Sequence, residues 1–249
     1  MVVYRIGTAG WSMPPSPETP SPAQGTHLDR YAERFNAVEI NSSFYKPHRP
    51  TTYERWAASV GPDFRFSVKV PKAITHEQRL VATDVLLDVF LSDATALGDK
   101  LGCLLVQLPP SLAYDLGTAA AFFDDVRARY GGAIALEPRH ASWFSADVAE
   151  QLRAYRIARV AADPAPVPAA AEPEGWPDVV YIRLHGSPDM YYSSYDEPYL
   201  DRLAARLRDA AARAHEVWCI FDNTGRGAAM PNALGLLERL SPIAPRPSR

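Results

Sequence analysis

The feature that most constrains the fold is a regular alternation of short apolar runs with amphipathic stretches along nearly the whole chain. The apolar runs are Val3–Ile6, Ala37–Ile40, Phe64–Val70, Leu101–Leu108, Ala133–Leu136, Ala158–Ala162, Val179–Leu184 and Val217–Phe221. Each run has the length of a strand. Several are apolar on both faces, as in parallel strands that helices cover. The pattern therefore predicts an α/β fold with a parallel sheet.

Helical periodicity fills the stretches between these runs. The helix-like stretches are Leu28–Arg34, Thr52–Ala58, Val85–Leu97, Phe122–Tyr130, Val148–Tyr155, Leu200–Leu207 and Pro231–Leu240. In the clearest case, Leu200, Leu203 and Leu207 recur at helical spacing, with arginine and aspartate on the opposite face. Eight strands with helices between them in 249 residues match the arithmetic of a TIM-type (β/α)8 barrel.

Two segments depart from this regular pattern. Residues Asp163 to Asp178 contain five prolines and cannot form a continuous helix, so an extended connection is expected between the sixth and seventh strands. The segment Trp11–Thr26 is also rich in proline and serine, and is either a mobile cover over the barrel mouth or a disordered insertion. We expect a single domain over residues 1–240 and a disordered tail over 241–249.

Composition restricts the partners and the compartment. With 26 basic and 29 acidic residues the net charge is −3, which argues against general attraction to nucleic acid or to an anionic membrane. No apolar run approaches the roughly 18 residues of a membrane span, and the N-terminus lacks a secretory pattern. Cys103 and Cys219 sit inside apolar runs, as expected for reduced thiols in a cytosolic protein. The sequence leaves the oligomeric state open.

Polar and ionisable residues cluster where the apolar strands end. They are Glu39, Asn41, Lys69, Gln107, Glu137, Arg139, Asp163, Arg183, His185, Asp222 and Asn223. In a parallel barrel the carboxyl ends of the strands converge on one mouth, where active sites of this architecture lie. A buried charge without a partner costs several kcal/mol, so these charges are expected to pair with one another or with a ligand.

The loops that follow the strands add further candidates. In Asn223–Gly227, the backbone of Gly225 and the side chain of Arg226 could hold a phosphate, or the segment is a plain surface turn. Tyr191 could stack on a ligand, with loop packing as the equal alternative. His76 is either a ligand-binding residue or the start of a helix, and His140 follows the fifth strand.

A divalent metal is the alternative to an anion at this mouth, although no cofactor is expected. The residues that could compose a metal site are Glu39, Glu137, His140, Asp163 and His185. They show no local metal-binding motif, and the positive charges of Lys69, Arg139 and Arg183 oppose a cation. No Ser-His-Asp pattern or reactive cysteine is visible.

Several sequence segments, spread in order along the chain, together match the pattern of a known family. They are Ile6–Trp11, Val38–Tyr45, Phe66–Pro71 with Ile74–His76, Gln107–Pro110, Glu137–His140 with Trp143, Tyr181–Gly186, and Phe221–Thr224. Together they resemble the YecE-like family, also catalogued as domain of unknown function seventy-two. The resemblance implies a TIM barrel and no established reaction. Family members usually carry paired asparagines after the last strand, where this chain has Asp222-Asn223 and thus an extra negative charge.

The leading hypothesis is an enzyme acting on a small polar anion such as a sugar phosphate. The cationic residues assigned to the anion are Lys69, Arg139 and Arg183. Glu39 and Glu137 would act as general acid and base, one of them with a raised pKa, and His185 would shuttle a proton. Two rivals stay open. One is a metal-dependent hydrolase or isomerase of phosphodiesters or sugars, and the other is a ligand-binding module without turnover.

Overall fold

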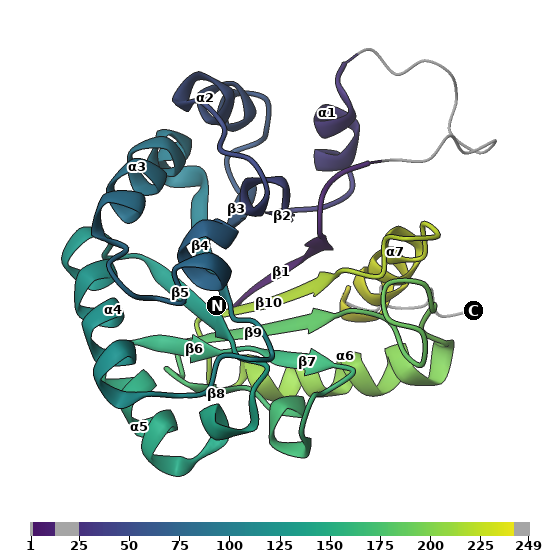
Figure 1. Cartoon of the computed structure of the whole chain (residues 1–249). Coiled ribbons are helices and arrows are strands. Elements are labelled where there is room, and N and C mark those ends of the chain that lie inside the picture. The colour runs from purple at the N-terminus through teal and green to yellow at the C-terminus, as the bar shows by residue number, and fades with distance from the viewer. Residues whose placement is uncertain (1, 13–24, 242–249) are drawn as a thin grey trace, which may run out of the picture.

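The computed structural model describes residues 2–12 and 25–241 (Figure 1). The strands are β1 (Val3–Thr8), β2 (Ala37–Ile40), β3 (Arg65–Lys69), β4 (Leu101–Gln107), β5 (Ala133–Glu137), β6 (Ile157–Arg159), β7 (Ala161–Asp163), β8 (Glu174–Gly175), β9 (Val179–Leu184) and β10 (Glu216–Phe221). The helices are α1 (His27–Ala32), α2 (Pro50–Ala58), α3 (Asp84–Ala94), α4 (Leu116–Arg129), α5 (Ala146–Ala154), α6 (Glu197–Ala211) and α7 (Ala229–Leu240). Figure 1 shows the strands at the centre of the molecule and the helices around them.

The strands form two sheets, and this confirms a mixed α/β fold with parallel pairing. One sheet has four strands in the order β1-β10-β9-β7, and the other has six in the order β2-β3-β4-β5-β6-β8. Every pairing is parallel except that of the two-residue β8 with β6. All the predicted strand runs are present. The sixth is divided into β6 and β7 at Val160, whose N–H donates to the carbonyl of Leu136 on β5 at 2.9 Å.

The edge strands β1 and β2 of the two sheets lie against each other. A single parallel bridge joins Ala9, just beyond β1, to Glu39 on β2. The hydroxyl of Tyr31 on α1 adds a second link, because it accepts from the N–H of Thr8 at 2.8 Å and donates to the carbonyl of Ala37 at 3.0 Å. One buried tyrosine therefore satisfies backbone groups of both strands.

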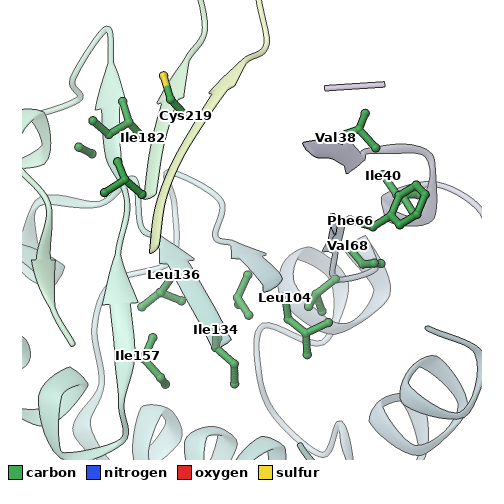
Figure 2. Close-up of a cluster of buried hydrophobic side chains, with 14 of the residues drawn as sticks. Val38, Ile40, Phe66, Val68, Leu104, Ile134, Leu136, Ile157, Ile182 and Cys219 are labelled. Atoms are coloured by element: carbon green, nitrogen blue, oxygen red, sulfur yellow. The ribbon is translucent and has the colours of Figure 1, made fainter. Parts of the chain in front are cut away.

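The alternation of side chains along the strands divides the interior in two. Figure 2 shows side chains from one face of the strands, including Val38 and Ile40 of β2 and Leu136 of β5, in a cluster of buried hydrophobic side chains. This cluster includes helix residues such as Phe122 of α4, so these side chains form the layer between strands and helices. The other parity forms a smaller cluster between the strands, made of Ala37, Cys103, Leu105, Ala135, Val160, Tyr181, Trp218 and Ile220. Cys103 and Cys219 are both buried and unbridged.

Polar side chains fix the starts of several helices. The side chains of Asp115, Ser145 and Asp196 accept hydrogen bonds from backbone N–H groups in the first turns of α4, α5 and α6. Such caps satisfy donors that a helix leaves free at its N-terminus. Each of these helices therefore begins at a fixed residue, which sets the length of the loop from the preceding strand.

The irregular segments agree with the predictions wherever they are described. The proline-rich connection of residues 163–178 holds only a short 3-10 turn, Pro168–Ala171, and β8. It contains no α-helix, as its prolines require. Most of the segment Trp11–Thr26 and the predicted tail over 241–249 lie outside the described residues. Within residues 2–12 and 25–241, no helix is long and apolar enough to cross a membrane.

Candidate functional site

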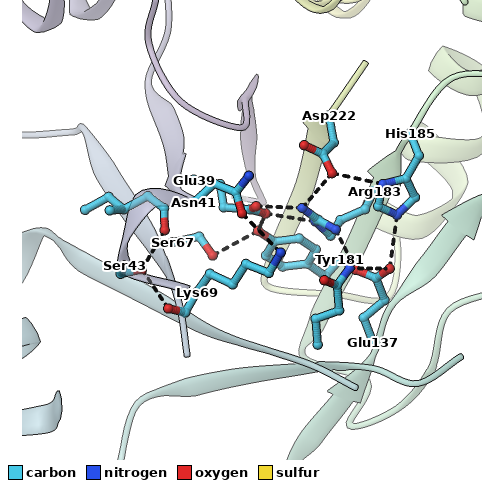
Figure 3. Close-up of polar contacts among 12 residues, drawn as sticks. Glu39, Asn41, Ser43, Ser67, Lys69, Glu137, Tyr181, Arg183, His185 and Asp222 are labelled. Carbon is cyan, nitrogen blue, oxygen red and sulfur yellow. Dashed lines mark hydrogen bonds and ion pairs between the residues drawn. The ribbon is translucent and has the colours of Figure 1, made fainter. Parts of the chain in front are cut away.

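The ends of five strands bring charged side chains together at one place (Figure 3). Glu39, Lys69 and Glu137 come from β2, β3 and β5, while Arg183 comes from β9 and Asp222 directly follows β10. All five are at most 5% exposed. The sequence predicted this gathering, because the carboxyl ends of parallel strands lie on one side of the sheets.

Arg183 is the centre of this cluster. Its guanidinium donates to both carboxylate oxygens of Glu39, at 2.7 and 2.9 Å. It also donates to Glu137 at 2.7 Å and to Asp222 at 3.0 Å. Burial alone would lower the pKa of Arg183, but the three carboxylates raise it well above its usual value. Arg183 was expected to hold a ligand anion. With 0% exposure and three carboxylate partners, its guanidinium instead orients the acidic side chains.

His185 lies between two of these carboxylates. Its Nε2 is 3.0 Å from Glu137 Oε1, and its Nδ1 is 3.0 Å from Asp222 Oδ2. Burial would lower the pKa of the imidazole, but the charge of Glu137 and the hydrogen bonds to both carboxylates raise it overall. The arrangement therefore favours the doubly protonated ring, with one N–H directed at each carboxylate.

Glu137 receives more donors than any other carboxylate of the cluster. Besides Arg183 and His185, it accepts from Gln107 Nε2 at 3.1 Å and from Arg139 Nη2 at 3.1 Å. Burial would raise its pKa, but the positive charges of Arg183 and His185 hold that pKa well below the usual value. The expectation of a raised carboxyl pKa is therefore not met at Glu137, whose carboxylate is stabilised in its ionised form.

The carboxylate of Glu39 has two side-chain partners among the described residues. Besides Arg183, it has the hydroxyl of Tyr181 at 3.1 Å, and that hydroxyl also lies 2.9 Å from the Ser67 hydroxyl. Glu39 is 0% exposed, which places its carboxylate beneath the surface of the site. The sequence pattern did not point to Tyr181 or Ser67. Parity could have found Tyr181, because it precedes Arg183 by two residues and shares its face of β9.

Lys69 has a different environment from the other charges. Its Nζ donates to the side-chain oxygen of Asn41 at 3.1 Å and lies 4.2 Å from the centre of the Phe44 ring. Burial and the charge of Arg183 lower the pKa of Lys69 to about 8, against the opposing effect of the nearby carboxylates. Lys69 is thus a buried amine whose proton is weakly held.

Arg139 and His76 lie at the rim of the cluster and are partly exposed. The side chain of Arg139 is 20% exposed. His76 is half-buried, and its pKa is lowered by burial and then by the charges of Lys69 and Arg139. Both of those charges therefore act on one side chain, which indicates that the three residues lie near one another.

A small cavity opens beside the Glu137–His185 pair. It has a volume of about 130 Å³. Its lining residues are Glu137, Arg139, Ala162, Pro164, Ala165, Pro166, His185 and Met190. The start of the proline-rich connection and the charged groups of the cluster thus both line the cavity.

Several predicted residues have structural partners near the cluster. Asn223 is fully buried, and its Nδ2 donates to Ser193 O and to Asn232 Oδ1, both at 2.9 Å. The carboxylate of Asp163 accepts from the hydroxyl of Tyr195 at 2.9 Å. These contacts fasten the loop after β9 to its neighbours.

Of the remaining loop candidates, Tyr191 borders the site. Gly225, Arg226 and His140 have partners in the loops. The Tyr191 ring packs edge-on against His185, with the ring centres 5.9 Å apart. The N–H of Gly225 donates to the Tyr191 carbonyl at 2.9 Å, and Arg226 lies over the Tyr192 ring. His140 accepts from the N–H of Ser142 at 3.2 Å and begins a short 3-10 helix.

The acidic groups of the cluster surround a positive charge. Within the described part of the chain, no group of three or more histidine, cysteine, aspartate or glutamate side chains is arranged to hold one. The guanidinium of Arg183 occupies the position between Glu39, Glu137 and Asp222. A divalent cation there would meet that positive charge at close range.

This chain is similar to one protein family and to individual relatives in two bacteria. Residues 5–248 match the family described as "Protein of unknown function DUF72". The UPF0759 protein YecE of Escherichia coli (strain K12) is 32% identical over 151 residues, which cover 58% of this chain and 55% of the relative. The chain thus spans about half the length of that relative. The UPF0759 protein YunF of Bacillus subtilis (strain 168) is 26% identical, with 97% of each chain covered.

Solved structures with the same fold are also found. A DUF72 family protein from Enterococcus faecalis V583 aligns with a TM-score of 0.80 and 22% identity, covering 96% of this chain and 95% of that one. A DUF72 family protein from Thermotoga maritima MSB8 aligns with a TM-score of 0.77 and 24% identity, covering 95% and 98%. At these identities the likeness concerns the fold.

Proposed function

The chain belongs to the DUF72 family of proteins of unknown function, and we propose that it is an enzyme that binds a small anion such as a sugar phosphate. The observation that carries this proposal is the charge of the site. Three carboxylates face two cations within the cluster, Arg183 and the protonated His185, while Lys69 and Arg139 add further positive charge at the rim. The site is therefore locally positive in a chain of net charge −3.

Arg139 is the side chain best placed to meet the anion. It is the partly exposed cation beside the cavity, and only its Nε and Nη2 are directed at Glu137. A guanidinium binds phosphate or carboxylate with directed, charge-assisted hydrogen bonds. In this proposal the ammonium of Lys69 adds a second positive charge near the anion, and Arg183 keeps the acidic groups in position.

The Glu137–His185–Asp222 arrangement supports proton transfer on the bound ligand. Glu137 and His185 both line the cavity, so a ligand there would lie within reach of a carboxylate base and of an imidazolium acid. Asp222 holds the second ring nitrogen of His185 and so fixes the orientation of the ring. The reaction class that these groups favour is general acid–base chemistry, such as isomerisation or hydrolysis.

Thermal unfolding with a panel of anions tests the proposal. Orthophosphate, glycolaldehyde phosphate, ribose 5-phosphate and citrate at millimolar concentration are compared with the matching uncharged sugars. An anion whose concentration is ten times its dissociation constant should raise the free energy of unfolding by about 1.4 kcal/mol. The shift should be lost in Arg139→Met and kept in Arg213→Met, a substitution of an exposed arginine outside the site. The absence of a shift with every anion would refute the anion site.

Turnover is measured separately from binding. The anion that stabilises most is incubated with the protein and followed by NMR. Conversion that is lost in Glu137→Gln supports an enzyme. Recovery of the ligand unchanged after long incubation supports the rival hypothesis of a binding module.

We also propose that the two sheets form one closed (β/α)8-type barrel, with residues 1–240 as its single domain. Two observations support closure. The N–H of Gly10 donates to the Glu39 carbonyl at 2.8 Å, and β6 passes through Val160 directly into β7. In a closed barrel the Gly10 amide should be protected from hydrogen exchange as strongly as amides within β2. Exchange as fast as in the exposed loops would indicate open sheets.

A cytosolic location is a further proposal, and so is the lack of a nucleic-acid partner. The two buried, unbridged cysteines support the former, and the net charge of −3 supports the latter. Cell fractionation and a nucleic-acid binding assay test them.

A further inference from the structure

The chain has only four lysines, and the structure separates them into two classes. Lys46 and Lys72 are exposed, whereas Lys69 and Lys100 are buried. The ammonium of Lys100 donates to two backbone carbonyls, at 2.9 and 2.8 Å, as expected for a structural lysine. Lys69 has a single hydrogen bond among the described residues, to an amide oxygen.

The amine of Lys69 is held in place by few interactions. The carboxylates that would otherwise hold it, Glu39 and Glu137, are engaged by Arg183 at 2.7 to 2.9 Å. Its other close neighbour is the ring of Phe44, which cannot accept its proton. A buried lysine that lacks an ion-pair partner is poised to lose its proton and to react as an amine.

His76 lies against the same aromatic ring as Lys69. The centres of the His76 and Phe44 rings are 4.9 Å apart. Burial and the neighbouring positive charges lower the pKa of His76, so its ring is neutral near neutral pH and can accept a proton. Lys69 therefore has a nearby neutral imidazole, and the charge of Arg139 also acts on that imidazole.

We propose that Lys69 is a nucleophile that forms an imine with a small anionic aldehyde or ketone, and this rests on the proposed anion site. Arg139 would hold the anionic group while Lys69 meets the carbonyl carbon. The nitrogen lone pair forms the C–N bond, and the π electrons of the carbonyl move to its oxygen. Both protons of the neutral amine then leave with that oxygen as water, which leaves a C=N bond and balances the reaction.

The protonation of Lys69 agrees with this role. Its pKa of about 8, against 10.5 for an ordinary lysine, corresponds to roughly 300-fold more neutral amine near neutral pH. The gain in reactivity is smaller than the gain in neutral amine, because a weaker base is also a weaker nucleophile. We therefore expect at least about tenfold preference for Lys69 over the other lysines.

The experiment is borohydride trapping with glycolaldehyde phosphate, followed by peptide mapping by mass spectrometry. Lys46, Lys72 and Lys100 are internal controls in the same molecule. The expected result is reduced adduct on Lys69 at least about tenfold above each of the others near pH 8. Arg139→Met should slow labelling by glycolaldehyde phosphate more than it slows labelling by uncharged glycolaldehyde. Lys69→Arg keeps the charge without a nucleophilic amine and should abolish the adduct, and circular dichroism checks that it folds.

Two outcomes separate this inference from the proposed function. If anions raise the unfolding temperature while Lys69 is labelled no faster than Lys46 and Lys72, the nucleophile is refuted and the anion site stands. If glycolaldehyde labels Lys69 selectively while no anion stabilises the protein, the nucleophile is supported and the anion site is refuted.

Discussion

At the scale of single residues, the site depends on one buried arginine. Arg183 bonds to Glu39, Glu137 and Asp222, and each of these carboxylates is buried. Buried ion pairs add little net stability, but the loss of one partner leaves a charge without compensation. The cluster therefore behaves as a network in which the removal of its centre affects all three acids.

We predict that Arg183→Met lowers the free energy of unfolding by about 3–5 kcal/mol near neutral pH. Glu137→Gln should cost less, because the amide keeps the shape and its oxygen still accepts hydrogen bonds. The double variant should recover only part of the loss, since Glu39 is left without a cation and Asp222 keeps only His185. Urea denaturation measures all three. An Arg183→Met variant within about 1 kcal/mol of the wild type would show that the network is not formed.

The lowered pKa of Lys69 predicts a specific pH dependence of the free energy of unfolding. Its pKa is lowered from 10.5 to about 8 on folding, so between these values the unfolded chain binds more protons. Stability contributed by this group should therefore rise with pH, by about 2 kcal/mol from about pH 7 to about pH 9.5. Urea denaturation of the wild type is compared with Lys69→Met, in which this rise should vanish. Equal slopes in the two proteins would contradict the lowered pKa.

At the scale of elements, the contact between β1 and β2 is set by a glycine. A Cβ at Gly7 would lie 2.0 Å from the carbonyl oxygen of Ala37 and 2.8 Å from the hydroxyl of Tyr31. The first of these is a backbone atom and cannot rotate away. The absence of a side chain at Gly7 therefore permits β1 to approach β2.

We predict that Gly7→Ala destabilises the protein by about 3 kcal/mol or more, because the new methyl group forces the strands apart. Gly61→Ala is the matched control, since a Cβ at that position meets no atom within 4 Å. Thermal or urea unfolding of both variants gives the comparison. A Gly7→Ala protein as stable as the control would mean that β1 and β2 are not in contact.

At the scale of the whole molecule, Tyr31 joins the two sheets. Its hydroxyl bonds to Thr8 of β1 and Ala37 of β2, at the edge where only one backbone bridge joins these strands. The group belongs to a helix, so α1 takes part in holding the sheets together as well as in covering them.

We predict that Tyr31→Phe lowers the free energy of unfolding by about 1–3 kcal/mol, because it leaves a buried N–H and a buried carbonyl with one partner fewer. Tyr45→Phe is the control, since Tyr45 is 69% exposed. Hydrogen exchange should also quicken at Thr8 in the Tyr31 variant. Unchanged stability and unchanged exchange at Thr8 would contradict the role of Tyr31 as a link.

The sequence by itself determined the elements and the place where the charged side chains gather. Strand runs such as Ala37–Ile40 can be predicted from the sequence because the burial of strand residues is local and periodic. The positions of Glu39 and Glu137 can be predicted because alternation along the strand places their side chains on the face opposite the helices. The prolines of 163–178 excluded a helix for a local reason, since proline lacks the N–H that a helix interior needs.

Only the tertiary structure decided what the individual charges do. Arg183 looks like a ligand-binding cation in the sequence, but residues 39, 137 and 222, far away along the chain, saturate it. Lys69 looks equally cationic, yet its burial and the charge of Arg183 lower its pKa to about 8. Burial and pairing depend on contacts between strands distant in sequence, and protonation follows from those contacts, so residue type and spacing do not fix them.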